Sequence, residues 1–164
     1  MRVRGRPRAL DGVAFEFGTG DGVKTGRAAL QWDWKSRWLQ SANWHVGGYW
    51  DVALAYWKWN NGAPALHEEL FDFGLTPVFR LQPNGLAGPY VEAGIGFHLL
   101  SHSSIGDNHL STAFQFGSHV GVGYRFGEKR CFEVGYRFQH MSNAGIKDPN
   151  AGMNFHQVRA QYHF

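Results

Sequence analysis

The sequence contains no long hydrophobic run, and its apolar stretches are only a few residues long. A membrane-spanning helix needs about 20 consecutive apolar residues, so a helical membrane protein is excluded. Cysteine is nearly absent, and the single Cys131 cannot form a disulfide within the chain. Charge of one sign is not in large excess either, because the formal net charge is only +3. A nucleic-acid partner is therefore not expected.

Glycine and aromatic residues are abundant instead. The chain has 22 Gly, seven Trp and 16% aromatic residues, which favours strands, because helical proteins prefer Ala, Leu, Glu and Lys. Eight stretches alternate apolar and polar residues with a period of two, separated by segments with Gly, Pro, Asn or Asp. These predicted strands cover residues 13–19, 27–34, 46–59, 70–82, 90–100, 112–126, 131–142 and 155–164.

The two faces of these strands differ in the same way along the chain. Successive side chains of a strand point to opposite faces. One face carries nearly all the Phe and Trp, for example Phe15, Trp50 and Phe97, and the other carries both signs of charge, for example Glu92 and Arg137. So much aromatic volume does not fit the lumen of an eight-stranded barrel, whereas Gly, Ala and paired ions do.

This pattern predicts an all-β fold, an eight-stranded antiparallel up-and-down β-barrel that spans the bacterial outer membrane with its apolar face toward lipid. A soluble ligand-binding barrel of the lipocalin type is the alternative. The barrel is expected to occupy residues 13–164. Residues 1–12 are expected to form a disordered N-terminal basic arm, whose arginines are not followed by the apolar segment of a secretory signal.

The chain ends and the connections predict how the barrel is oriented. With both termini in the periplasm, every odd-numbered connection is external, including the seventh, residues 143–154. Connections 83–89 and 127–130 are short, as periplasmic turns should be, whereas 35–44 is longer. The C-terminal Phe164 with Tyr162 resembles the terminal signature of bacterial outer-membrane proteins. The expected location is the outer membrane of a Gram-negative cell.

A His-x-Ser pair stands at the end of the seventh predicted strand. The alternation continues past Phe138 to His140 and Ser142, which places both on the lipid-facing side at the outer end. Residues i and i+2 of a strand are neighbours on one face, so the imidazole can reach the hydroxyl and take its proton. The alternative is that both lie among lipid headgroups, where polar residues cost little. By itself such a pair is a weak signal.

The residues around the pair resemble a known enzyme family. The segment from His140 to Asn150, HMSNAGIKDPN, is similar to the signature of the outer-membrane lipid A 3-O-deacylases, the PagL-like proteins. Further similarity follows in matching order at WDW (32–34), GYWD (48–51), PVF (77–79) and EAGIG (92–96). The resemblance implies a barrel that removes the ester-linked 3-hydroxyacyl chain at position 3 of lipid A in the outer leaflet, at the extracellular side. It implies no metal or other cofactor.

By the family motif, Ser142 would be the nucleophile and His140 the general base. An acidic residue twelve positions after the serine orients the histidine in that family, but this chain has Asn154 there. Parity places Asn154 on the same outward face, where its oxygen could fix the imidazole tautomer without offsetting its positive charge. Asp148, in the external connection, is the alternative acidic partner, whereas Glu133 has inward parity and lies far down the strand.

Three residues after the serine are candidates for the oxyanion site. Asn143, Gly145 and Asn150 could donate hydrogen bonds to the tetrahedral intermediate, or they could simply form a turn.

The other histidines give no clear site. His98, His102 and His109 gather around one external connection, but no spacing resembles a zinc motif. Solvation or headgroup contact is expected there rather than a metal.

Three functions remain open at this stage. The first is an esterase whose partners are lipid A, as the lipopolysaccharide substrate, and outer-membrane lipid. The second is a non-catalytic or very slow barrel that has lost its acidic residue at Asn154 and serves as an interaction or structural protein. The third is acyl transfer to an acceptor other than water. The sequence does not tell whether the barrels pair into homodimers.

Overall fold

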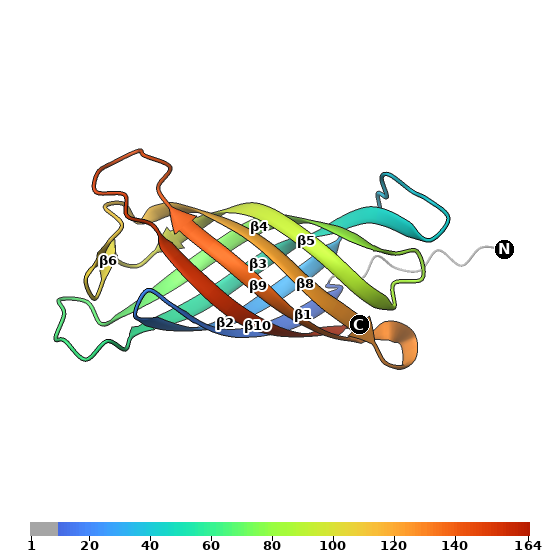
Figure 1. Cartoon of the computed structure of the whole chain (residues 1–164), viewed down its shortest axis with the longest axis horizontal. Coiled ribbons are helices and arrows are strands. Elements are labelled where there is room, and N and C mark those ends of the chain that lie inside the picture. The colour runs from blue at the N-terminus through green and yellow to red at the C-terminus, as the bar shows by residue number, and fades with distance from the viewer. Residues whose placement is uncertain (1–9) are drawn as a thin grey trace.

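Eight long strands close into one antiparallel barrel in the computed structural model, which describes residues 10–164 (Figure 1). In chain order they are β1 (Gly12–Gly20), β2 (Val23–Asp33), β3 (Trp44–Trp59), β4 (Glu69–Pro83), β5 (Gly88–Leu100), β8 (Phe114–Phe126), β9 (Phe132–Ser142) and β10 (Met153–His163). The barrel closes where β1 pairs with β10, and Gly12 lies opposite His163. Closure satisfies the backbone of both terminal strands. The predicted fold is confirmed.

The strand boundaries agree with the prediction to within a few residues, with two differences. β2 begins at Val23 rather than at 27, because Asp21 and Gly22 form a two-residue turn that lets β1 and β2 pair to their ends. A small hairpin of β6 (Ser104–Ile105) and β7 (Asn108–His109) was not predicted, since two residues per strand show no alternation.

The predicted basic arm covers residues 1–12, of which residues 1–9 lie outside the described residues. Its last residue, Gly12, already belongs to β1, so the barrel begins one residue earlier than predicted. Within the described part of the chain, no helix is both long and apolar enough to cross a membrane.

The two ends of the barrel differ. The last strand ends where the first begins, and this end also holds connections 34–43 and 84–87 and the 3-10 helix η1 (Glu128–Arg130) (Figure 1). The opposite end carries the turn at 21–22 and the connections 60–68, 101–113 and 143–152. The seventh connection lies at the end opposite the termini, as predicted, and Ser142 ends β9 at that rim.

The outer surface of the barrel is apolar over most of its height. Phe17 and Ile95 are 66% and 67% exposed, and many other large apolar side chains are also exposed. Burying such groups is favourable by about 25 cal/mol per Å², so this surface belongs in lipid. The soluble-barrel alternative is therefore wrong.

The interior is filled by charges that neutralise one another. Within residues 10–164, one connected network joins four carboxylates to four guanidinium groups: Glu16, Asp51, Glu92 and Glu133 with Arg27, Arg80, Arg137 and Arg159. Glu92 accepts hydrogen bonds from Arg80 at 2.7 Å, from Arg137 at 2.6 Å and from the Tyr49 hydroxyl at 2.8 Å. An unpaired buried charge costs several kcal/mol, so the equal numbers of opposite charges make this interior possible.

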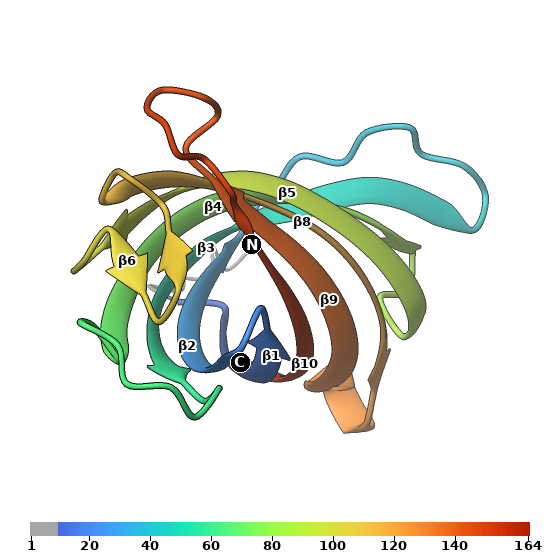
Figure 2. The same cartoon turned by 60° about the vertical axis from the view of Figure 1, so that its left-hand side comes forward.

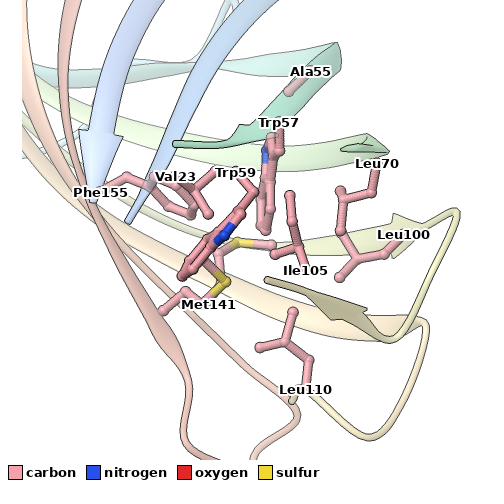
Figure 3. Close-up of a cluster of buried hydrophobic side chains, with 11 residues drawn as sticks. Val23, Ala55, Trp57, Trp59, Leu70, Leu100, Ile105, Leu110, Met141 and Phe155 are labelled. Carbon is pink, nitrogen blue, oxygen red and sulfur yellow. The ribbon is translucent and has the colours of Figure 1, made fainter. Parts of the chain in front are cut away.

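One part of the prediction for the interior is wrong. Trp57, Trp59 and Phe155 point inward, as the alternation requires, but they form an apolar layer where Gly, Ala and paired ions were expected. They lie above the ion network, where the barrel interior meets the 101–113 connection, and pack into an apolar outer-end cluster (Figure 3). Its buried members are Val23, Ala55, Trp57, Trp59, Leu70, Leu100, Ile105, Leu110, Met141, Met153 and Phe155. The cluster fills this end of the barrel.

The ion network generates a stability prediction. Glu92→Gln keeps the shape of the side chain but leaves Arg80 and Arg137 with one negative partner fewer. We expect the free energy of unfolding to fall by about 3–5 kcal/mol, because a buried charge loses its counter-charge. Urea titration of the detergent-solubilised barrel, followed by tryptophan fluorescence, measures this change.

The matched control is Glu69→Gln. Glu69 is exposed, and its carboxylate lies 3.7 Å from the Lys58 ammonium, so its loss should cost less than about 1 kcal/mol. Equal losses in the two variants would contradict a stabilising interior network.

Candidate active site

His140 and Asn154 face each other across the last pair of strands. They are direct partners in the β9–β10 register, and His140 Nδ1 lies 2.8 Å from Asn154 Oδ1. An amide oxygen can only accept, so Nδ1 carries the proton and Nε2 is left with a lone pair. The predicted contact between these two residues is present.

Ser142 lies two residues beyond His140 on the same outward face, opposite Phe116 of β8. Its hydroxyl makes no hydrogen bond to any residue in the described range 10–164. It is partly exposed at the rim. An unbonded hydroxyl on the same face as an imidazole with a free Nε2 lone pair is available for activation.

The backbone around this pair is held from the inside of the barrel. Met141 and Met153, the inward neighbours of His140 and Asn154, have no exposed surface and belong to the outer-end cluster. Their burial fixes the ends of β9 and β10, so the outward side chains between them keep their spacing. The apolar filling of the barrel thus orients the polar pair on its surface.

Gly152 lies directly behind the His140 imidazole and leaves no room for a side chain at this position. Its φ is +68°, and a Cβ there would lie 2.8 Å from His140 Cε1 and 3.0 Å from the Met141 carbonyl oxygen. Any larger residue would push the ring outward. Sequence reasoning missed this residue, and the only available signal was a Gly just before the last predicted strand.

The connection after Ser142 is folded by its own polar residues. Asn143 N–H donates to Asn150 Oδ1 at 3.0 Å, and Gly145 N–H donates to Asn143 Oδ1 at 2.9 Å. The Asn143 amide nitrogen donates to the Lys147 carbonyl at 2.7 Å and, across to the 101–113 connection, to the Leu110 carbonyl at 3.0 Å. The three oxyanion candidates therefore do form a turn, which lies beside the β6–β7 region (Figure 2).

The two other carboxylates considered from the sequence lie in different places. Asp148 is exposed in the 143–152 connection, and its side chain makes no hydrogen bond within residues 10–164. Glu133 is buried at the far end of β9 and binds Arg80 at 2.8 Å and His163 at 2.9 Å. Neither is bonded to His140.

The three clustered histidines are not brought together. His98 is buried and its Nδ1 lies 2.9 Å from Asp72 Oδ1, while His102 stacks on His67 with ring centroids 4.1 Å apart. His109 lies on β7. In the part of the chain that the structure describes, no three His, Cys, Asp or Glu side chains form a metal-binding group.

An apolar groove on the outside of the barrel leads to His140. It crosses β4, β5, β8 and β9 and has an empty volume of about 1030 Å³. Its lining residues are Pro77, Phe79, Ala93, Gly94, Ile95, Ser118, His119, Val120, Phe138 and His140. Small residues at 93, 94 and 118 between larger ones create the hollow. The sequence showed small outward residues at 93 and 118, but not that the pairing of β5 with β8 brings them together.

The chain is similar to known lipid A deacylases over most of its length. A family model described as "Lipid A 3-O-deacylase (PagL)" matches residues 24–163. The chain belongs to the PagL family. It is 34% identical over 152 residues to the lipid A deacylase PagL of Pseudomonas aeruginosa, a match that covers 92% of this chain and 84% of that protein.

Two further comparisons support the same assignment. The lipid A deacylase PagL of Bordetella bronchiseptica is 31% identical over 160 residues, which covers 93% of this chain and 83% of that protein. A crystal structure of the outer membrane enzyme PagL superposes with a TM-score of 0.81 at 30% identity and covers 93% of this chain and 99% of that one. This PagL-family barrel is therefore a lipid A deacylase of the outer membrane, as the sequence resemblance predicted.

The close contact behind the imidazole generates a prediction. Gly152→Ala should lower the deacylation rate about tenfold or more, because its Cβ displaces His140 and small misplacements of catalytic groups are costly. Release of 3-hydroxy fatty acid from lipopolysaccharide, per amount of folded barrel, measures the rate. Gly62→Ala is the control, since Gly62 has a similar φ of +76° but no atom within 4 Å of an added Cβ. A normal rate in Gly152→Ala would refute this role.

Proposed function

We propose that the chain is a serine esterase that hydrolyses the 3-O-linked 3-hydroxyacyl chain of lipid A in the outer leaflet, with Ser142 as nucleophile and His140 as general base. The observation that carries this proposal is the 2.8 Å contact between His140 Nδ1 and Asn154 Oδ1. It directs the Nε2 lone pair away from β10 and fixes the tautomer that a general base needs.

The reaction then follows in two steps. Ser142 Oγ attacks the ester carbonyl carbon while His140 Nε2 takes the hydroxyl proton, and the tetrahedral intermediate collapses as that proton passes to the departing sugar oxygen. The acyl chain is now an ester of Ser142. Water attacks this ester, gives one proton to Nε2, and releases the 3-hydroxy fatty acid as Ser142 Oγ recovers the proton. No step requires a cofactor.

A donor must stabilise the negative oxygen of each tetrahedral intermediate. The side-chain donors of Asn143 and the main-chain N–H of Gly145 are already used inside the turn. Asn150 uses only its Oδ1 there, so its amide nitrogen is free among the described residues. Asn150 is therefore the oxyanion donor that this geometry favours.

The groove is the proposed site for the acyl chain that is cleaved. It is apolar and open to the membrane, and His140 forms one end of it. An acyl chain lying in it would bring its ester carbon toward the rim, where Ser142 stands. The site is on the lipid-facing side of the barrel, so lipid A could react without leaving the membrane.

The nucleophile assignment is tested by Ser142→Ala. We expect no measurable release of 3-hydroxy fatty acid, with an unchanged urea midpoint, because the variant removes only the attacking oxygen. Mass spectrometry of the lipid A and of the released products measures both sides of the reaction. Free fatty acid from the unmodified protein also separates hydrolysis from transfer to another acceptor.

The control is Ser41→Ala, an exposed serine in the connection at the opposite end of the barrel, which should retain full activity. Continued release by Ser142→Ala would exclude Ser142 as the nucleophile.

The groove is tested by filling it. Ala93→Leu places a larger side chain on its floor and should lower kcat/KM about tenfold, because overfilling a packed site costs about 1–3 kcal/mol. Ala28→Leu makes the same change on the outward face of β2, in a different surface hollow lined by β1, β2, β3 and β4. Equal activity of these two variants would contradict binding of the acyl chain in the groove.

A further inference from the structure

A carboxylate touches the active-site residues from the far side of the barrel seam. Asp21 lies in the turn between β1 and β2, and its Oδ2 accepts a hydrogen bond of 2.6 Å from the backbone N–H of Asn154. Asn154 in turn accepts from His140 through its side chain. Asn154 thus connects the two groups: its main-chain N–H binds the Asp21 carboxylate, and its side-chain oxygen binds the His140 imidazole.

The turn that carries Asp21 is rigidly built. Asp21 and Gly22 have φ of +48° and +77°, and Gly20 pairs with Val23. Positive φ at both central residues is the type I′ hairpin turn that Asp-Gly and Asn-Gly sequences favour. The side chain of Asn108 also donates to the Asp21 carbonyl oxygen at 3.0 Å, which ties the turn to the β6–β7 hairpin.

The approach of this turn to Asn154 is unusually close. A Cβ at Gly20 would lie 1.6 Å from the Asn154 carbonyl oxygen, so only glycine allows β1 to come so near to β10. The close approach brings the next residue, Asp21, against the Asn154 amide. Strand packing at the seam therefore sets the position of the turn, from which the exposed Asp21 side chain reaches the Asn154 N–H.

We propose that Asp21 supplies the negative charge that the His140–Asn154 pair lacks, as a positioning residue that acts through Asn154. This inference rests on the proposed function of His140. An amide can fix the tautomer of a catalytic histidine but carries no charge to stabilise the imidazolium that forms during attack. A carboxylate hydrogen-bonded to the backbone of the same residue provides a negative charge on the side of Asn154 away from His140.

The other titratable groups around His140 do not offer the same contact. By strand register these groups are His156 on β10 and Lys24 on β2, and Lys147 and Asp148 lie in the 143–152 connection. On β8, the residue opposite His140 is Ser118, which does not titrate, and the neighbouring His119 points into the barrel. Within residues 10–164, none of these side chains is hydrogen-bonded to His140 or Asn154.

The test is Asp21→Asn, measured on the full-length protein in detergent micelles. Asparagine keeps the hydrogen-bond acceptor and suits a type I′ turn, so the variant removes the charge alone. We expect kcat to fall about threefold to tenfold, and the acid limb of the pH–rate profile to move to lower pH by about half a pH unit. The sign follows because a nearby carboxylate favours the protonated imidazole, and His140 must be unprotonated to act as the base.

Two controls separate charge from structure. Asp107→Asn removes another carboxylate from a connection at the same end of the barrel and should leave both the rate and the profile unchanged. In a protein with Asn154→Glu, the charge is supplied at position 154 itself, so adding Asp21→Asn should no longer lower kcat. A loss of the same size in both backgrounds would mean that Asp21 only supports the structure, and would overturn the proposal.

A readout independent of turnover completes the test. The His140 ring proton, followed by NMR against pH in a Ser142→Ala barrel, should titrate at lower pH after Asp21→Asn. An unmoved midpoint overturns the role of Asp21 even if the enzyme is active. A different result is that the midpoint moves but neither the protein with Asn154 nor the Asn154→Glu variant releases fatty acid. In that case Asp21 acts on His140 as proposed, and the esterase assignment fails.

Discussion

The closure of the backbone in lipid is the constraint on which the rest of this structure depends. Every N–H and C=O group in the membrane must find a partner within the protein, and eight strands meet this need by pairing around a ring. In a closed barrel each side chain points either into the interior or outward to the lipid. Charges therefore gather inside, where four carboxylates meet four guanidinium groups within the described chain, and any chemistry directed at lipid must use the outward positions.

The proposed active site lies on the outer surface of the barrel, where no surrounding domain holds its side chains in place. Here the strand register takes that role, because it sets His140 against Asn154 and places Ser142 two residues further along. The register is in turn held by buried neighbours, Met141 and Met153, in the outer-end cluster. On both strands the inward and outward residues alternate: Met141 and Met153 fill this end of the barrel, and their neighbours His140 and Asn154 form the polar pair on its surface.

The period of two made most of this predictable from the sequence. It identified the eight strands, the inverted distribution of charge, and the outward position of the residues at 140, 142 and 154. It placed Trp57 and Trp59 on the inward face correctly, but alternation does not tell that the interior becomes apolar near the rim. Alternation also cannot show contacts across the seam, where residues 21 and 154 meet only because the first strand pairs with the last.

The position of the charge has a physical advantage. A carboxylate at position 154 would stand on the lipid-facing side of β10, where an ionised group is costly to desolvate. An amide there costs less, and a carboxylate in the exposed turn at Asp21 keeps contact with water and headgroups. The electrostatic support for His140 is then weaker than that of a directly bonded acid, since it is exerted through the Asn154 backbone. On this argument the deacylation rate is lower than with a carboxylate at position 154, but the free energy cost of placing the site at the membrane surface is also lower.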